Sequence, residues 1–236
     1  VQIDNFGCFN DNLNAITIPN TLLEIGNYAF KNNNLEEVVL TDNVRFIGAG
    51  AFENNNIATV SLPEQLEIIE SEAFAGNKLT EIDLPDALTY IQPACFKNNL
   101  LSRVSLPENL VIIGEEAFSG NELTELALPK LLMEVGIKAF AGNKLKHIMV
   151  SNQLMMLGME AFNQPEDKFE YIIVDTPEPP MIEEGGGLNA TFGKNPENIK
   201  VLVPAAQLAV YEDWAETKNR YNRPMTFDRQ DFDVDY

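Results

Sequence analysis

Apolar residues recur along this chain in short units of constant length. A small residue followed by Phe returns every 22 residues, and one further pair, Cys8-Phe9, lies one residue out of phase. Each unit also holds a stretch such as Ile82-Asp83-Leu84, whose alternation is the period of a strand with one buried face. The in-phase pairs are Ala29-Phe30, Ala51-Phe52, Ala73-Phe74, Cys95-Phe96, Ala117-Phe118, Ala139-Phe140 and Ala161-Phe162. Helical-hairpin repeats usually need about 33 residues or more, so the pattern predicts short β-coils that bury their apolar side by stacking.

Turn residues mark the ends of each coil. Pro follows the alternating stretch in most units, as at Pro63 and Pro85, and ends the strand because it lacks a backbone N–H. The second residue after Phe is Asn or Gly, which both tolerate a left-handed turn. The third is Asn in each unit from Asn33 to Asn143. Because an amide both donates and accepts, we expect an inward ladder of Asn side chains; the alternative is a row of exposed turn formers.

The coils are expected to pile up in register. Their strands would lie about 4.8 Å apart in one long parallel sheet. Pairs such as Leu88 and Ile91 would form the return side, as short strands or 3-10 turns, and the Phe rings would fill the interior. The pattern loosens after Phe162, and Pro165 stands where the next ladder Asn would be.

The segments Val104-Ser105-Leu106-Pro107, Ile113-Gly114 and Ala117-Phe118, with Asn121 after them, carry a known pattern. It resembles the BspA-like leucine-rich repeat family, over about residues 8–174. The segment from Thr176 to Trp214, with Val201 to Ala205 inside it, also resembles the closing segment of such proteins from Bacteroides-type bacteria. Departures from the pattern replace its Gly at Glu70 and Gln92, and its Pro at Thr41 and Ser151.

The predicted fold is a right-handed leucine-rich-repeat solenoid of the α/β repeat class, mostly β, with the parallel sheet on its concave side. Residues 1–174 would form the solenoid and residues 175–236 a C-terminal cap. The last repeat strand would hold Phe169, Ile172 and Val174. The cap would consist of a loop (Pro177 to Gly187), a strand (Ile199 to Val203), a helix (Ala205 to Lys218) and an acidic tail (Asp228 to Tyr236).

Composition narrows the possible partners. The chain has 36 acidic and 16 basic residues, a formal charge of −20, which argues against nucleic acid and against an anionic membrane surface. A glycan or a basic protein face is compatible, and so is a charge that only maintains solubility. No apolar run approaches the roughly 18 residues of a membrane span. The chain starts at Val1 without a Met or a signal peptide, so we expect a fragment or a mature form.

Two columns of sheet residues should face solvent and carry the candidate binding site. In the first, Glu81, Arg103 and Glu125 form a charge-alternating row, whose alternative interpretation is a surface ion ladder. Farther along, His147, Met149 and Tyr171, with Ile173, form a less polar patch that would seat a sugar ring or a peptide unless the cap covers it. The candidate ligand-binding residues are Glu81, Asp83, Arg103, Glu125, His147, Met149 and Tyr171.

A second stripe is expected on the return side. It holds Phe46, Ile68, Tyr90, Ile112 and Met156. An apolar row of this length suggests a partner interface. The alternative is that each side chain packs between coils, which low exposure of all five would establish.

The sequence contains few of the features that catalysis or cofactor binding would require. The chain has one His, and the phosphate-binding, zinc-protease and C-x-x-C motifs are absent from it. Cys8 and Cys95 are each expected to take the place of the small residue before Phe in their coils. We expect both to be free, buried thiols, because they are too far apart to form a disulfide. The four Asp residues from Asp228 to Asp235 lack the Gly and Glu of a calcium loop, so a solvated tail is favoured.

The family resemblance implies an extracellular or cell-surface bacterial protein that adheres to host proteins or other cells. We therefore expect a non-catalytic binding protein, without metal or cofactor, whose ligand is a protein or glycan, with host molecules among the candidates. The alternatives are a rigid spacer that presents another domain and, remotely, a polysaccharide-degrading enzyme.

Overall fold

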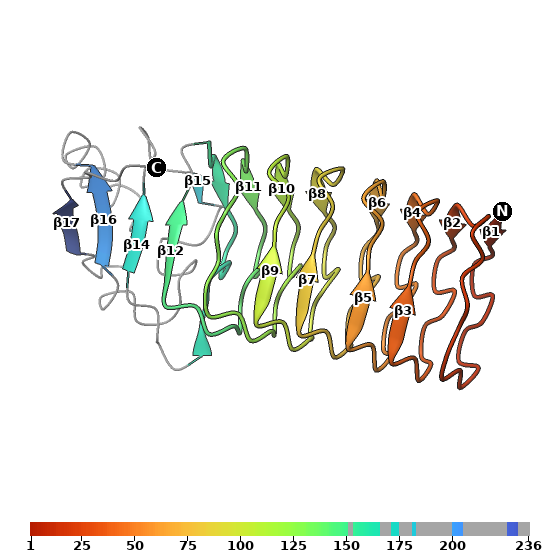
Figure 1. The fold of residues 1–236 in the computed structure, drawn as a ribbon. Helices are drawn as coiled ribbons and strands as arrows, with labels where there is room; N and C mark the ends of the chain where they lie inside the picture. Colours follow the sequence, from red (N-terminus) through yellow and green to blue (C-terminus); the bar gives the residue numbers. More distant parts are fainter. Residues whose placement is uncertain (151–152, 166–170, 175–180, 183–199, 205–225, 231–236) are drawn as a thin grey trace.

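The structure, a computed structural model, describes residues 1–150, 153–165, 171–174, 181–182, 200–204 and 226–230. Short strands stack side by side in two rows along an elongated coil (Figure 1). The first row, here called the long-strand face, holds β3 (Glu37–Val39), β5 (Thr59–Ser61), β7 (Glu81–Asp83), β9 (Arg103–Ser105), β12 (His147–Val150), β14 (Tyr171–Val174), β16 (Lys200–Pro204) and β17 (Thr226–Gln230). The second, the short-strand face, holds β1 (Gln2–Ile3), β2 (Glu24–Ile25), β4 (Phe46–Ile47), β6 (Ile68–Ile69), β8 (Tyr90–Ile91), β10 (Ile112–Ile113), β11 (Glu134–Val135), β13 (Met156–Leu157) and β15 (Met181–Ile182). The expected mostly β leucine-rich-repeat solenoid is confirmed.

All strand pairings are parallel, and the repeat sets their register, as where Glu37 on β3 pairs with Thr59 on β5. The long-strand face is divided, however, into the ladders β3-β5, β7-β9 and β12-β14-β16-β17. Between the second and third ladders, only Ala127 forms a bridge, to Met149. Strands of three residues that end at Pro have few inter-coil hydrogen bonds, so the loss of one bond interrupts the expected continuous sheet.

The interior is a column of stacked Phe rings. From Phe30 to Phe162, successive ring centroids lie 5.3–5.8 Å apart and the rings are within 14° of parallel. The six rings from Phe52 onward are fully buried. Each ring is therefore covered on both faces by the neighbouring coils, except at the ends of the column.

The inward Asn ladder is confirmed, and the alternative of exposed turn formers is wrong. Asn77 is 6% exposed. Its Oδ1 accepts the backbone N–H of Ile57 at 3.1 Å, and its Nδ2 donates to the carbonyls of Phe52 and Phe74 at 2.9 and 3.1 Å. One side chain thus satisfies backbone groups in its own coil and in the preceding one.

The ladder continues past Asn143 in a way that the sequence pattern missed. Pro165 occupies the ladder position, but Gln164, one residue earlier, takes over the role. Its Oε1 accepts the N–H of Leu145 at 3.2 Å, and its Nε2 donates to the carbonyls of Phe140 and Phe162, both at 3.1 Å. The extra methylene of Gln compensates for the one-residue offset.

Each coil between Tyr28 and Gly142 contains two left-handed residues. The predicted position, two residues after Phe, has φ between 55° and 71° from Asn32 to Gly142. A second position, immediately before the Ala-Phe pair, was not predicted and carries ordinary side chains, such as Tyr28 (φ 57°), Ala94 (φ 53°) and Glu116 (φ 53°). Around this position, successive backbone N–H groups donate hydrogen bonds alternately within the turn and to the next coil. The N–H of Phe96, for example, donates to the carbonyl of Ala117 in the next coil. These bonds hold a conformation that costs about 1–2 kcal/mol per residue outside glycine.

The first coil corrects the placement of Cys8. The N–H of Cys8 donates to Ala29 just as that of Phe30 donates to Ala51, and Asn33 Nδ2 donates to the Cys8 carbonyl at 2.7 Å. Cys8 therefore occupies the Phe position, and the coil is in phase with the others. Cys95 does replace Ala, as expected. Both thiols are free, but Cys8 is only half-buried, because there is no described coil beyond it.

At the other end, β16 matches the strand expected at Ile199 to Val203, and β14 matches the last repeat strand. Two expectations fail locally. The expected loop contains β15, which pairs with β13, and Asp228 lies in β17 rather than in a tail. The expected helix (205–218) and residues 231–236 lie outside the described residues, and the domain boundary at 174 remains a prediction. The described segments include no helix long and apolar enough to cross a membrane.

Candidate functional site

The first group of candidate residues surrounds Arg103 on the long-strand face. Strands β7 and β9 lie in register, so Glu81 is directly beside Arg103. Arg103 Nη2 donates to Glu81 Oε2 at 3.0 Å, and Nη1 donates to Asp83 Oδ1 at 3.2 Å. These hydrogen bonds and charges raise the pKa of Arg103, with the Glu81 bond as the largest cause. All three side chains are exposed, so a cation here lies between two carboxylates on an open surface.

Glu125 does not join this group. It is exposed in a coil that forms no strand next to β9, and within the described residues Arg103 pairs only with Glu81 and Asp83. The expected row of alternating charges is thus a fork from one Arg to two carboxylates of the preceding coil.

The second group is an aromatic pair on β12 and β14. His147 and Tyr171 are register partners, and their rings stack with centroids 4.9 Å apart and an interplanar angle of 4°. Met149, 37% exposed, lies on the same face and pairs with half-buried Ile173. His147 is exposed and Tyr171 half-buried. His147 and Met149 are therefore open to solvent, and Tyr171 and Ile173 partly so. The alternative that the cap covers the patch stays a prediction, because most of the cap lies outside the described residues.

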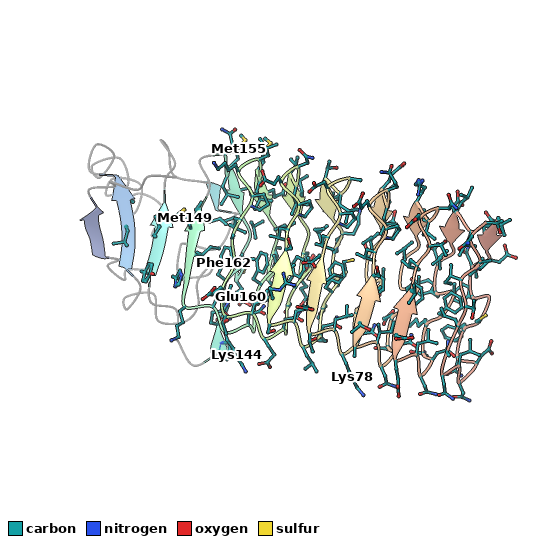
Figure 2. The ribbon with its side chains drawn as sticks, in the orientation of Figure 1. Lys78, Lys144, Met149, Met155, Glu160 and Phe162 are labelled. Carbon is teal, nitrogen blue, oxygen red and sulfur yellow. The ribbon has the colours of Figure 1, made fainter. Side chains whose placement is uncertain are left out.

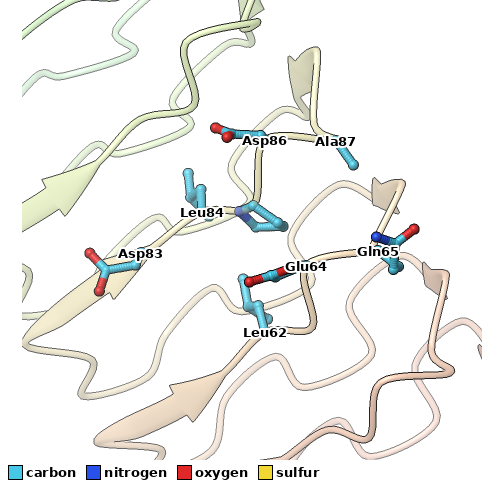
Figure 3. A pocket seen from close by; sticks show the side chains of 8 residues that line it. Leu62, Glu64, Gln65, Asp83, Leu84, Asp86 and Ala87 are labelled. Atoms are coloured by element: carbon cyan, nitrogen blue, oxygen red, sulfur yellow. The ribbon is translucent and has the colours of Figure 1, made fainter.

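A groove that the sequence did not predict adjoins the Arg103 group. It has a volume of about 660 Å³ and lies where β5 and β7 end, between coils whose strands belong to different ladders (Figure 3). Three of its residues are carboxylates: Glu64, Asp83 and Asp86. The remaining lining residues are Leu62, Gln65, Leu84, Pro85 and Ala87. The only sequence signal for it is the acidic residue that follows Pro63 and Pro85.

These surfaces combine charged, hydrogen-bonding and aromatic side chains. The described residues include no group of three or more His, Cys, Asp or Glu arranged to hold a metal ion. The Arg103 group offers charge and hydrogen bonds, the groove adds negative charge, and the His147–Tyr171 pair adds a rigid aromatic surface. Tyr and Arg are side chains that commonly anchor protein interfaces.

On the short-strand face, the expected apolar stripe is partly open. Ile68 is 41% and Tyr90 37% exposed. The alternative prediction, that all five side chains pack between coils, is therefore wrong for these two. Phe46, Ile112 and Met156 are half-buried. An adjacent column that the sequence analysis missed carries the larger exposures, at Leu23, Met133 and Met155.

Comparisons with known proteins agree with this architecture. The family model of the BspA type leucine-rich repeat region matches in six copies, over residues 1–102 and 91–174. A leucine-rich repeat protein from Bacteroides ovatus has a similar solved structure, with a TM-score of 0.62 and 22% identity over 97% of this chain and 75% of the other. A leucine-rich cell surface protein from Faecalibacterium prausnitzii is similar with a TM-score of 0.52 and 18% identity, over 86% of this chain and 76% of that one.

A search of curated proteins found no significant match. The two solved structures are too distant in sequence to support more than the shared fold. The family model, in contrast, spans most of the chain and covers the coils that build the Phe column and the Asn ladder. This chain belongs to the BspA-type leucine-rich repeat family.

Proposed function

We propose that the protein is a non-catalytic cell-surface protein that binds a protein or glycan through the long-strand face. The observation that carries the proposal is the stacked pair of His147 and Tyr171 beside exposed Met149. The pair is fixed on two four-residue strands in register, so little side-chain entropy is lost when a flat ligand settles on it. The similar Faecalibacterium protein, described as a cell surface protein, supports the location.

The Arg103 group and the acidic groove would supply the polar part of the same binding face. A bound ligand would accept hydrogen bonds from Arg103 or place a cation among Glu64, Asp83 and Asp86. The residues proposed to contact ligand are Glu81, Asp83, Arg103, Glu125, His147, Met149 and Tyr171.

Arrays of glycans and of extracellular-matrix proteins test this proposal. Wild-type protein should bind at least one class, and Tyr171→Ala and Glu81→Ala should each weaken that binding about ten-fold or more, as interface anchors do. Glu67→Ala, an exposed change beside the short-strand face, is the matched control. Unchanged binding in both test variants would eliminate the long-strand face as the binding site.

A rigid spacer is the second candidate. The continuous Phe column and the amide ladder from Asn33 to Gln164 favour it, because they tie every coil to the next. A spacer requires no ligand on the long-strand face. Cell adhesion that is insensitive to Tyr171→Ala, but lost when a presented domain is removed, would select this alternative.

A further inference from the structure

An apolar patch lies on the short-strand face of the coils that carry β10, β11 and β13, away from the proposed binding face. We call Val111, Ile112, Leu131, Met133, Met155 and Met156 the methionine patch. Leu131 is 51%, Met133 41% and Met155 58% exposed, and Met155 projects at the outer edge of its coil (Figure 2). Contiguous exposed apolar surface of this kind marks interaction sites in soluble proteins.

Apart from Leu131, which is two residues before Met133, the patch residues lie in two adjacent columns. The N–H of Met133 donates to Val111, and that of Met155 donates to Met133, both at 2.9 Å. In the neighbouring column, Ile112 pairs with Glu134 and Glu134 with Met156. Side chains within a column are thus one strand spacing apart, about 4.8 Å, and form a continuous surface.

The fold does not require apolar residues in the column of Val111, Met133 and Met155. The same column carries Arg45, Glu67 and Thr89 in the middle coils, bonded to their neighbours in the same way. The core is built instead by the next strand residues inward, such as Ile113 and Val135, which are completely buried. Polar residues could therefore replace Met133 and Met155 without disturbing the stacking of the coils.

Charge on this face indicates the kind of partner. Glu134 lies within the patch, between Ile112 and Met156. Burial raises the pKa of Tyr90, and Glu134 and Glu70 raise it further, as expected where the potential is negative. The whole chain carries −20. A second copy of this chain or an anionic membrane would be repelled, whereas a basic segment would be attracted.

The dimensions fit a short helix. Strands β10, β11 and β13 follow one another in a single ladder, so the outer strands of the patch lie about 10 Å apart, which is roughly the rise of two helical turns. Methionine side chains adapt to differently shaped apolar faces. We propose that the methionine patch is a docking surface for a cationic amphipathic helix of a partner protein.

The test uses the intact chain and a fluorescein-labelled synthetic peptide of two LKKLLKL heptads, which is long enough as a helix to span the patch. Fluorescence anisotropy should show saturable binding. Met133→Lys/Met155→Lys should weaken it about ten-fold or more, because both apolar anchors are lost and like charge is added. Leu100→Lys is the matched control, because Leu100 is 48% exposed outside the patch, and it should bind as wild type does. Lys is tolerated in this column, as Arg45 indicates.

Two further measurements define the chemistry. Glu134→Gln should weaken binding about three-fold and reduce its dependence on salt. A peptide with the same residues shuffled to abolish the apolar face should bind at least ten-fold more weakly. Equal binding of the shuffled peptide, or an unchanged affinity of the double variant, would overturn the proposal. So would a concentration-dependent dimer of the free protein that Met133→Lys/Met155→Lys abolishes, because the occupant would then be a second copy.

Discussion

The side-chain nitrogen of Gln164 donates a hydrogen bond to the carbonyl oxygen of Phe140, one coil earlier, at 3.1 Å. Asn143 Nδ2 makes the equivalent bond to Phe118 at 2.9 Å. Two different amides at two different sequence positions therefore perform the same task. What the fold requires at this turn is a buried amide with one acceptor and one donor group, and the residue type is secondary.

This equivalence predicts the behaviour of two variants in the last complete coil. Gln164→Ala should leave the N–H of Leu145 without its acceptor, and hydrogen exchange at that amide should accelerate. Gln164→Gly/Pro165→Asn recreates the Gly-Asn pair found at Gly142-Asn143 and should restore slow exchange. If the double variant exchanges as fast as Gln164→Ala, the turn of this coil differs from the others.

Within the ladder, Asn99→Ala should lower the free energy of unfolding by about 2–4 kcal/mol, since buried backbone groups lose their partners. The groups concerned are the N–H of Leu79 and the carbonyls of Phe74 and Phe96. Urea denaturation followed by circular dichroism measures the loss. The control is Asn109→Ala, whose exposed amide makes one long bond of 3.4 Å and which should change stability by no more than about 0.5 kcal/mol. Equal effects of the two substitutions would contradict the ladder's role.

Most of the fold could be predicted from the sequence because each position of the repeat occurs in several coils, so the property that its residues share can be recognised. The inward Asn side chains and the left-handed turn after Phe were deduced from residues that share one property. The second left-handed position was missed because Tyr28, Ala94 and Glu116 share none. Their conformation is imposed by hydrogen bonds to the next coil, which a single unit does not reveal.

The candidate site was less predictable for a related reason. Glu81 and Arg103 are 22 residues apart, so their contact followed from the period. His147 and Tyr171 are 24 residues apart, so their contact followed only when two inserted residues were allowed for. The break between β5 and β7 and the groove beside it did not, because the loss of a few hydrogen bonds leaves no mark in the repeat. The place of Cys8 in the repeat was mispredicted for the same reason. Backbone hydrogen bonds place it at the Phe position, although the Cys8-Phe9 pair resembles the Ala-Phe pairs of the other coils.

The unpredicted left-handed position yields its own test. Ala94→Gly should stabilise the protein by up to about 1 kcal/mol, because glycine removes the steric cost of φ 53° and only part of that gain is offset by chain entropy. Gly50 already occupies the same position in another coil. Ala73→Gly, at a buried position that lacks a positive φ, should instead destabilise by about 1 kcal/mol. Thermal or urea unfolding of both variants compares the two signs, and destabilisation by both would show that the left-handed turn carries no strain.

The buried thiol of Cys95 predicts a pH dependence. Burial is the main cause that raises its pKa, so the thiol stays protonated in the native state, whereas an unfolded Cys ionises near pH 8.5. Its contribution to stability is therefore complete below about pH 8.5 and decreases by roughly 1.4 kcal/mol per pH unit above it. Cys95→Ala introduces the residue that other coils have at this position and removes only this titration. Urea unfolding at pH 7 and pH 10 should show a smaller loss of stability in Cys95→Ala than in wild type, with Lys and Tyr titrating alike in both. A wild-type-to-variant difference that stays constant with pH would mean that the thiol ionises equally in the folded and unfolded states.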